Sequence, residues 1–201
     1  MRKSTRSFSS EVPSEEDIRN ILESAVYAPY GGATGIPLNQ IRKLYVFKQN
    51  TESMTAIREL IHLRISKNAK RFRILLTLLP FMKKKFNAFS IKLNGMAKSG
   101  IPSLNEAPYF IVIAEKKGFP PVEKQSMAHA LENMWLTATS LELGFQLISA
   151  TGTMSGDKDF MNLLGLEKGE YEIEGCAIGY PKKKTERKRE LNLNDFTTWI
   201  K

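Results

Sequence analysis

The segment of residues 122–152 constrains the fold more than any other part of the chain. No Gly or Pro interrupts residues 123–143, and the apolar residues recur at the three- and four-residue spacing of an α-helix. Additional small and apolar residues widen this stripe, so we expect the helix to be buried on more than one side. Gly144 is expected to end it, because glycine adopts the left-handed conformation at a helix C-terminus without a Cβ clash. A short apolar run then leads to Thr151 and Gly152.

Three further segments have the composition of β-strands. Residues 108–115 (PYFIVIAE) form a nearly continuous run of β-branched, aromatic and other apolar residues. Such a run is typical of a central strand whose two faces are both buried. Residues 43–47 and 175–180 indicate two more strands.

Helical patterns separate these strands. Residues 14–17 (SEED) are typical of a helix start, with Ser14 as the cap and acids in the first turn, and Pro29 ends that helix. Residues 53–65 predict an amphipathic helix, and residues 157–164 a short one that stops at Gly165. The alternation of helices and strands predicts one α+β domain over residues 1–201, layered around a single sheet.

Residues 66–103 fit this pattern poorly. They mix bulky apolar residues with many Lys and Arg, and Pro80 must break or kink any helix that runs through them. Three interpretations remain open: a lid or insertion over a substrate cleft, which we favour; an interfacial helix on anionic lipid; or a packing element or dimer arm.

Charge and cysteine content limit the partners and the cellular compartment that we expect. The net charge of +9 and the pI of about 9.6 favour anionic partners such as nucleic acid, phosphorylated cofactors or anionic membranes. One cysteine, Cys176, excludes an intrachain disulfide and fits a reducing cytoplasm. The N-terminus has no apolar signal-peptide core, and residues 74–82 are shorter than the ~20 residues of a spanning helix. We therefore expect a soluble, cytoplasmic protein.

Side chains suited to catalysis are scarce. His62 and His129 are too isolated for a metal site, and Cys176 lies in an apolar strand that predicts an inert core thiol. Phosphate-binding groups, by contrast, are abundant: basic segments lie at residues 2–8 and 182–189, and three Gly fall in residues 30–37. Each basic segment could also be a solvated tail. The combination predicts that a bound phosphorylated cofactor carries the chemistry.

Four features in order along the chain resemble the FMN-dependent nitroreductases. Residues 2–8 (RKSTRSF) are similar to the R-x-S-x-R-x-F opening of that family. The capped helix that ends at Ala28-Pro29 is similar to its first helix, and the long helix with Leu143-Gly144 also matches. Residues 178–181 (IGYP), followed by arginines, complete the resemblance. It implies a nitroreductase-like α/β/α sandwich with a mainly antiparallel sheet and a long central helix, binding FMN at a homodimer interface.

The resemblance also implies site residues. One set would hold the FMN phosphate, ribityl chain and ring edge, with the last two at the phosphate: Arg2, Lys3, Ser4, Arg6, Arg187 and Arg189. Another set would line the flavin from the partner subunit: Pro29, Tyr30, Gly31 and Gly32. Thr151 and Gly152 would direct backbone N–H groups at the N5 and O4 region of the ring. No side chain is assigned as catalytic, and no metal is expected.

This chain departs from the family pattern after Pro29. The family commonly has Ser there, then an Asn and a Gln-Pro-Trp, where this chain has Tyr30, Ala33 and residues 36–38 (IPL). These departures bear on the substrate more than on flavin binding. We expect an oxidoreductase that uses NAD(P)H to reduce nitro compounds, quinones or similar acceptors. The alternatives are another flavin reaction, such as dehalogenation or flavin fragmentation, and a non-enzymatic basic protein that binds anionic lipid or nucleic acid.

Overall fold

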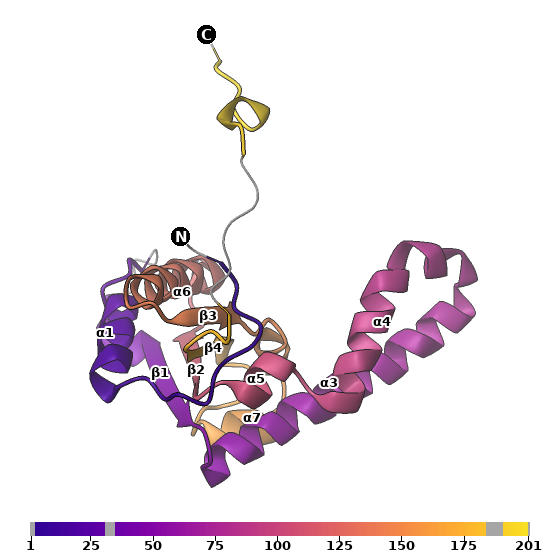
Figure 1. The fold of residues 1–201 in the computed structure, drawn as a ribbon, viewed down its shortest axis with the longest axis horizontal. Helices are drawn as coiled ribbons and strands as arrows, with labels where there is room; N and C mark the ends of the chain where they lie inside the picture. Colours follow the sequence, from indigo (N-terminus) through magenta and orange to yellow (C-terminus); the bar gives the residue numbers. More distant parts are fainter. Residues whose placement is uncertain (1–2, 31–34, 184–190, 201) are drawn as a thin grey trace.

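One antiparallel sheet forms the centre of the fold. The computed structural model describes residues 3–30, 35–183 and 191–200. Within these residues the strands are β1 (Arg42–Lys48), β2 (Tyr109–Lys116), β3 (Gly144–Leu147) and β4 (Tyr171–Gly179). They pair in the order β1-β2-β4-β3, and every pair is antiparallel (Figure 1). The predicted α+β fold with a mainly antiparallel sheet is confirmed, and its three expected strands are all present.

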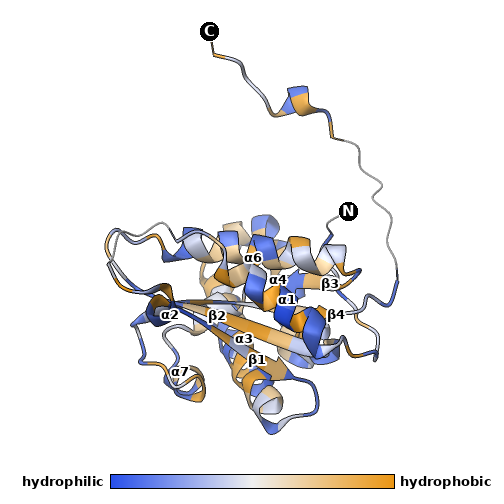
Figure 2. Cartoon of the chain, turned by 90° about the vertical axis from the view of Figure 1, so that its left-hand side faces the viewer, coloured by the Kyte–Doolittle hydropathy of each residue, from blue (hydrophilic) through white to orange (hydrophobic). Residues whose placement is uncertain are grey.

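Helices cover both faces of this sheet. On one face lie α1 (Glu15–Val26) and α6 (Glu123–Ser140); on the other lie α3 (Glu52–Leu78) and α7 (Lys158–Leu163). Figure 2 shows α6 above the strands and α7 below them. Because side chains alternate along a strand, Ile111 of β2 packs with α1 and α6, whereas Val112 packs with α3 and α7. This two-sided burial explains why β2 is apolar at successive positions.

Side-chain caps start three of the helices. Ser14 accepts a hydrogen bond from the Asp17 N–H, Thr51 from Met54, and Asp157 from Phe160. These bonds satisfy N–H groups that the first helical turn leaves without an intrahelical partner. The shorter elements are α2 (Leu38–Ile41), η1 (Pro80–Met82), α5 (Pro102–Glu106), η2 (Thr151–Met154) and η3 (Leu193–Asp195).

The end of α6 differs from the sequence prediction. The helix stops at Ser140, and Glu142 takes the left-handed conformation (φ 58°) that we assigned to Gly144. The Leu143 N–H bonds to the Ala138 carbonyl at 2.8 Å, which is the closing bond of a Schellman motif. Gly144 instead begins β3, where a Cβ atom would lie 2.5 Å from Oγ1 of Thr5. The glycine is required by close approach of the N-terminal segment, not by helix termination.

Replacing Gly144 with alanine is therefore expected to destabilise the protein. The new methyl group would overlap the Thr5 side chain, and relieving such overlap costs about 1–3 kcal/mol. Urea unfolding monitored by circular dichroism measures the loss. Gly156→Ala is the matched control, because a Cβ at Gly156 meets no atom within 4 Å. Equal stability of the two variants would contradict the role of the Thr5 contact.

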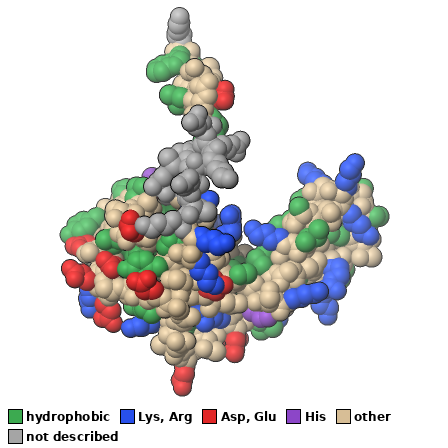
Figure 3. All heavy atoms as spheres, viewed as in Figure 1, with side chains coloured by type: hydrophobic (Ala, Val, Ile, Leu, Met, Phe, Trp, Pro, Cys, Tyr) green, Lys and Arg blue, Asp and Glu red, His purple; other side chains and the backbone are tan. Residues whose placement is uncertain are grey.

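A helical hairpin projects from the body. We predicted a helix that ends at residue 65, but α3 continues to Leu78, because no Gly or Pro interrupts it and its buried stripe extends through Ala69 and Leu76. The chain turns at Pro80, where a helix break was expected, and returns as α4 (Lys83–Ser99) (Figure 1). Figure 3 shows that basic side chains surround this hairpin. Within the described residues, none of the helices is long and apolar enough to cross a membrane.

Candidate functional site

The N-terminal segment lies along the edge of the sheet. Ser4 pairs with Phe145 in a parallel bridge, and the Thr5 N–H donates to the Phe145 carbonyl at 2.9 Å. Further along, the Ser9 N–H donates to the Tyr180 carbonyl at 2.8 Å. These backbone bonds place Arg6 beside the end of β3, 140 residues later in the sequence.

The same segment is fastened to the beginning of the basic C-terminal stretch. The Lys182 N–H donates to the Ser7 carbonyl at 3.2 Å, and Nζ of Lys182 lies 3.0 Å from Oε1 of Glu106. The other Glu106 oxygen accepts the Phe8 N–H at 3.0 Å. Hydrogen bonds from Lys182 and Phe8 hold the pKa of Glu106 below its usual range. Residues 7–9 and 180–182 therefore lie side by side. Arg2, Arg187 and Arg189 fall outside the described residues.

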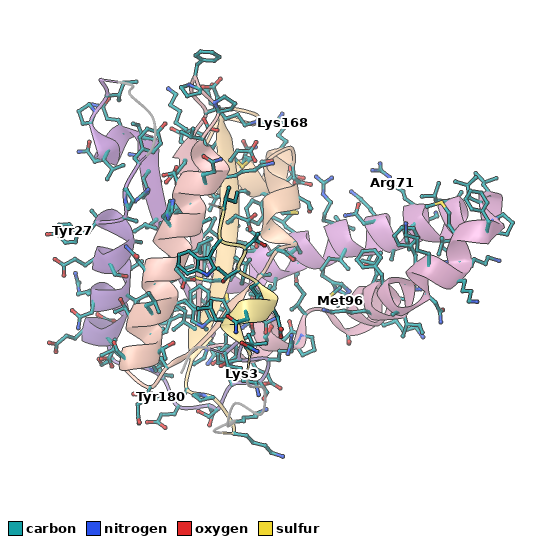
Figure 4. The ribbon with its side chains drawn as sticks, turned by 90° about the horizontal axis from the view of Figure 1, so that it is seen from above. Lys3, Tyr27, Arg71, Met96, Lys168 and Tyr180 are labelled. Carbon is teal, nitrogen blue, oxygen red and sulfur yellow. The ribbon has the colours of Figure 1, made fainter. Side chains whose placement is uncertain are left out.

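A cavity of about 630 Å³ lies between this segment, the end of β3 and the base of the hairpin. Its polar and charged lining comes from elements far apart in the sequence. Four of these residues are charged or carry an amide, namely Arg6, Asn68 of α3, Lys92 of α4 and Gln146 of β3, and four carry a hydroxyl, namely Ser99, Ser103, Ser149 and Thr153. Leu93, Met96 and Ile148 contribute apolar walls. Figure 4 views the arrangement from above, with Met96 at the base of the hairpin and Lys3 in the N-terminal segment.

One buried acceptor atom in the cavity lining lacks a hydrogen-bond partner within the described part of the chain, as expected where a ligand binds. Oε1 of Gln146 is inaccessible to solvent and has no hydrogen-bond partner among the described residues. A buried polar atom without a partner costs about 1–3 kcal/mol, so such atoms are rare unless a ligand or water satisfies them. Cofactor pockets of ~300–1,000 Å³ are mostly apolar with a few convergent polar groups. Size and lining therefore fit an FMN-sized molecule.

Some of the predicted site residues line this cavity and others do not. Arg6 lines it, and Lys3 and Ser4 precede Arg6 in the same segment. The Thr151 N–H already donates to the Ile148 carbonyl at 2.9 Å, and the side chain is buried against Gly175. Neither Thr151 nor Gly152 is among the described residues that line the cavity, so the contact of their N–H groups with a flavin ring stays a prediction.

The loop after α1 is placed elsewhere. Pro29 and Tyr30 are not among the described residues that line the cavity, while Gly31 and Gly32 lie outside the described residues. That these four residues reach the flavin from a partner subunit stays a prediction.

Of the residues that line the cavity, the sequence analysis named only Arg6 as a site residue. Asn68, Lys92 and Gln146 belong to no motif. The one signal for Asn68 is its spacing of three from Ile65, which places a polar residue near the buried stripe of α3. Gln146 and Lys92 carried no signal, because only the tertiary structure places α4 and β3 around one cavity.

A buried ion pair holds the loop after α1. Nε of Arg42 lies 2.6 Å from Oε1 of Glu115, and the guanidinium also donates to the carbonyls of Ala25 and Ala28 at the end of α1. Burial raises the pKa of Tyr30, the charges of Glu123 and Glu115 raise it further, and Arg42 opposes them. The network thus fixes the start of the loop that contains Pro29 and Tyr30.

Two titratable groups of β4, Glu174 and Cys176, flank Gly175, which lies against the Thr151 side chain. Burial raises the pKa of the Cys176 thiol, so this side chain is protonated and unreactive at neutral pH. Burial also raises the pKa of Glu174 to about 7, while Lys124 opposes that shift. Glu174 lines a smaller cavity of about 210 Å³ with Trp135 and Phe145, and a Cβ on Gly152 would lie 2.7 Å from its Oε1.

Glu174 is expected to make stability depend on pH near neutrality. Its pKa is higher in the folded protein than the ordinary value of 4.5, so folding favours the protonated carboxyl. This contribution is complete below pH 4.5 and is lost as pH rises through about 7. The loss amounts to ~1 kcal/mol after solvent screening of a half-buried group, or about 2–4 °C in Tm.

The Glu174→Gln variant provides the comparison. Its Tm should rise relative to that of the original protein between pH 5 and pH 8, because glutamine carries no titratable proton. Calorimetry across this range measures the difference, with Glu167→Gln at an exposed position as the control. Parallel curves for the original protein and Glu174→Gln would show that Glu174 does not titrate in this range.

One family model matches most of the chain. Residues 1–180 match the model of the Nitroreductase family. No curated protein matches the chain significantly.

Solved structures show the same fold. A nitroreductase with bound FMN from Bacteroides fragilis is 20% identical (TM-score 0.73), covering 100% of this chain and 95% of its own. A BluB-like flavoprotein from Clostridium difficile is 21% identical (TM-score 0.70; 100% and 95%). An FMN- and NADPH-dependent nitroreductase from a Sphigopyxis strain is 18% identical (TM-score 0.66; 100% and 96%).

Proposed function

The chain belongs to the nitroreductase family, and from this premise we propose that it is an FMN-dependent oxidoreductase. It would take hydride from NAD(P)H and pass two electrons to a small acceptor such as a nitro compound or quinone. The observation that carries the proposal is the cavity of about 630 Å³ beside Arg6, with the unpartnered Oε1 of Gln146 in its wall. The FMN- and NADPH-dependent neighbour supports the choice of cofactor and donor.

The residues of this chain would bind and orient the cofactor. Bound FMN supplies the hydride chemistry. Arg6 contributes a guanidinium whose fork geometry suits phosphate or a flavin edge, and Lys3 and Ser4 lie next to it. The Gln146 side-chain amide in the cavity wall would offer hydrogen bonds to the polar edge of a ring. By the family pattern, the Gly152 backbone N–H would add another.

The base of the hairpin would complete the pocket. Leu93 and Met96 of α4 provide apolar wall that keeps water away from the reacting atoms. Lys92 and Arg6 give the cavity positive charge, which attracts the anionic NAD(P)H molecule. These contacts support the interpretation of residues 66–103 as a lid, because the part of the hairpin nearest the body lines the cavity.

A homodimer is part of the proposal. Large apolar side chains are exposed on α6 at Leu136 and at the end of α1 at Val26 and Tyr27. Four more are exposed near the C-terminus: Leu193, Phe196, Trp199 and Ile200. Burial of such surface against a second copy drives association. It would also bring Pro29 and Tyr30 of one subunit toward the cavity of the other.

Spectroscopy of the purified protein tests the proposal. We expect a yellow protein with one FMN for each chain, a mass by light scattering of about twice 22.8 kDa, and anaerobic bleaching of the flavin by NADH or NADPH. Re-oxidation by a nitroaromatic compound or a quinone then identifies the acceptor class. A folded protein that binds no FMN at micromolar concentration would overturn the proposal, as would a flavin that neither nicotinamide reduces.

A further inference from the structure

The charge of this protein is concentrated in one part of the chain. Residues 60–105 contain ten of the 30 Lys and Arg residues and none of the 21 Asp and Glu residues. The other 155 residues therefore hold 20 basic and 21 acidic side chains, which nearly cancel. Most of residues 60–105 form the α3–α4 hairpin. The hairpin is thus the longest stretch of basic residues without an acid, in addition to the shorter basic segments at residues 2–8 and 182–189.

The far end of the hairpin adds exposed apolar side chains to this charge. We call residues 71–85 the hairpin tip; they include Arg71, Arg73 and Lys83–Lys85. Ile74, Leu78 and Phe81 are 52%, 72% and 79% exposed there. In Figure 3 the basic side chains surround this end, whereas the visible acidic side chains lie on the body.

One face of α3 combines the two properties. Lys67, Arg71, Ile74 and Leu78 recur at spacings of four, three and four residues, so they lie on one side of the helix. All four are exposed, while Ala69 and Leu76 of the same helix are buried. The cations lie toward the body and the apolar residues toward the tip.

The hairpin tip is structurally separate from the cavity. The base of α4 lines the cavity through Leu93 and Met96, whereas no residue of the tip does so among the described residues. Phe72 contacts Phe86 and Phe89 edge-on, with ring centroids 6.0 and 5.2 Å apart. This aromatic cluster joins α3 to α4 near the tip, so the exposed residues are held on a folded support.

We propose that the hairpin tip docks on an anionic lipid surface. Leu78 and Phe81 would enter the boundary between headgroups and acyl chains, as the apolar face of an interfacial helix does. Lys83–Lys85 and Arg71 would lie among the lipid phosphates, whose negative potential attracts clustered basic residues. A nucleic acid would satisfy the cations but would leave the exposed Leu78 and Phe81 in water.

Sedimentation with lipid vesicles tests the proposal on the full-length protein. Vesicles of phosphatidylcholine with about one third phosphatidylglycerol should bind it, and vesicles of pure phosphatidylcholine should not. Replacing Lys83, Lys84 and Lys85 with Gln should weaken binding roughly 100-fold. Leu78→Ser with Phe81→Ser should weaken it about tenfold or more, and this loss should persist at high salt, which screens charge but not apolar insertion.

The matched control removes the same charge from the body. Lys116, Lys158 and Lys168 are exposed, and their triple replacement with Gln should leave vesicle binding within about twofold. All variants should keep the original Tm and flavin content, because the exchanged side chains are exposed and lie outside the cavity.

Any of five results would overturn the proposal. The protein could bind neither kind of vesicle, or bind both equally. Binding could be unchanged in the tip variants, which would place it elsewhere, for example in residues 182–189. The Lys83–Lys85 variant could lose vesicle binding while the Leu78 and Phe81 variant keeps it and RNA competes with vesicles for the protein. That result would identify a general polyanion-binding site. Leu78→Ser with Phe81→Ser could lower the mass in light scattering, which would identify the tip as an interface between copies.

Discussion

Replacing Arg42 with methionine is expected to lower the free energy of unfolding by ~3–5 kcal/mol. Arg42 is 6% exposed and Glu115 is fully buried, so the variant leaves a carboxylate without its countercharge inside the protein. The carbonyls of Ala25 and Ala28 and the hydroxyl of Ser126 lose a donor in the same step. Methionine retains much of the side-chain volume, which isolates the electrostatic loss.

Urea unfolding of three variants tests this expectation. Arg19→Met, on an exposed position of α1, should change stability by less than about 0.5 kcal/mol. The double variant Arg42→Met with Glu115→Leu should recover part of the loss, because it removes both charges. A single variant within about 1 kcal/mol of the original would contradict the prediction. A double variant as unstable as the single one would assign the loss to the helix carbonyls instead.

Replacing both Arg187 and Arg189 with alanine should weaken FMN binding roughly 10²-fold or more. Each charge-assisted hydrogen bond to a phosphate contributes about 1.5–3 kcal/mol, and about 1.4 kcal/mol corresponds to a tenfold change. The prediction follows from the family resemblance. It is supported by the contacts of Lys182 with Ser7 and Glu106, which bring the chain before Arg187 close to the N-terminal segment.

Riboflavin distinguishes a phosphate contact from a general loss of structure. It lacks the phosphate, so its affinity for the double variant should match its affinity for the original protein. Fluorescence titration of the apo-protein with both flavins measures this, and Lys116→Ala with Lys168→Ala serves as the control for charge. Equal losses for FMN and riboflavin, or no loss for either, would show that the phosphate is held elsewhere.

Local sequence predicted three of the four described strands and the helices α1, α6 and α7. The caps at Ser14 and Asp157 depend on a side chain and an N–H three residues away, so the sequence suffices to predict them. The buried strand β2 was predicted because a run of apolar residues suits no exposed element. The N-terminal R-x-S-x-R-x-F motif identified Arg6, which lines the cavity.

Only the tertiary structure decided which distant residues meet. The Thr5 side chain, and not helix termination, requires Gly144, since the N-terminal segment lies against β3. Arg42 and Glu115, 73 residues apart, form an ion pair because β1 and β2 are neighbours in the sheet. Arg6, Asn68 and Gln146 line one cavity only because the tertiary structure places the N-terminal segment, α3 and β3 around it. Such contacts depend on strand order and helix packing, and a periodic pattern within one segment carries no information about either.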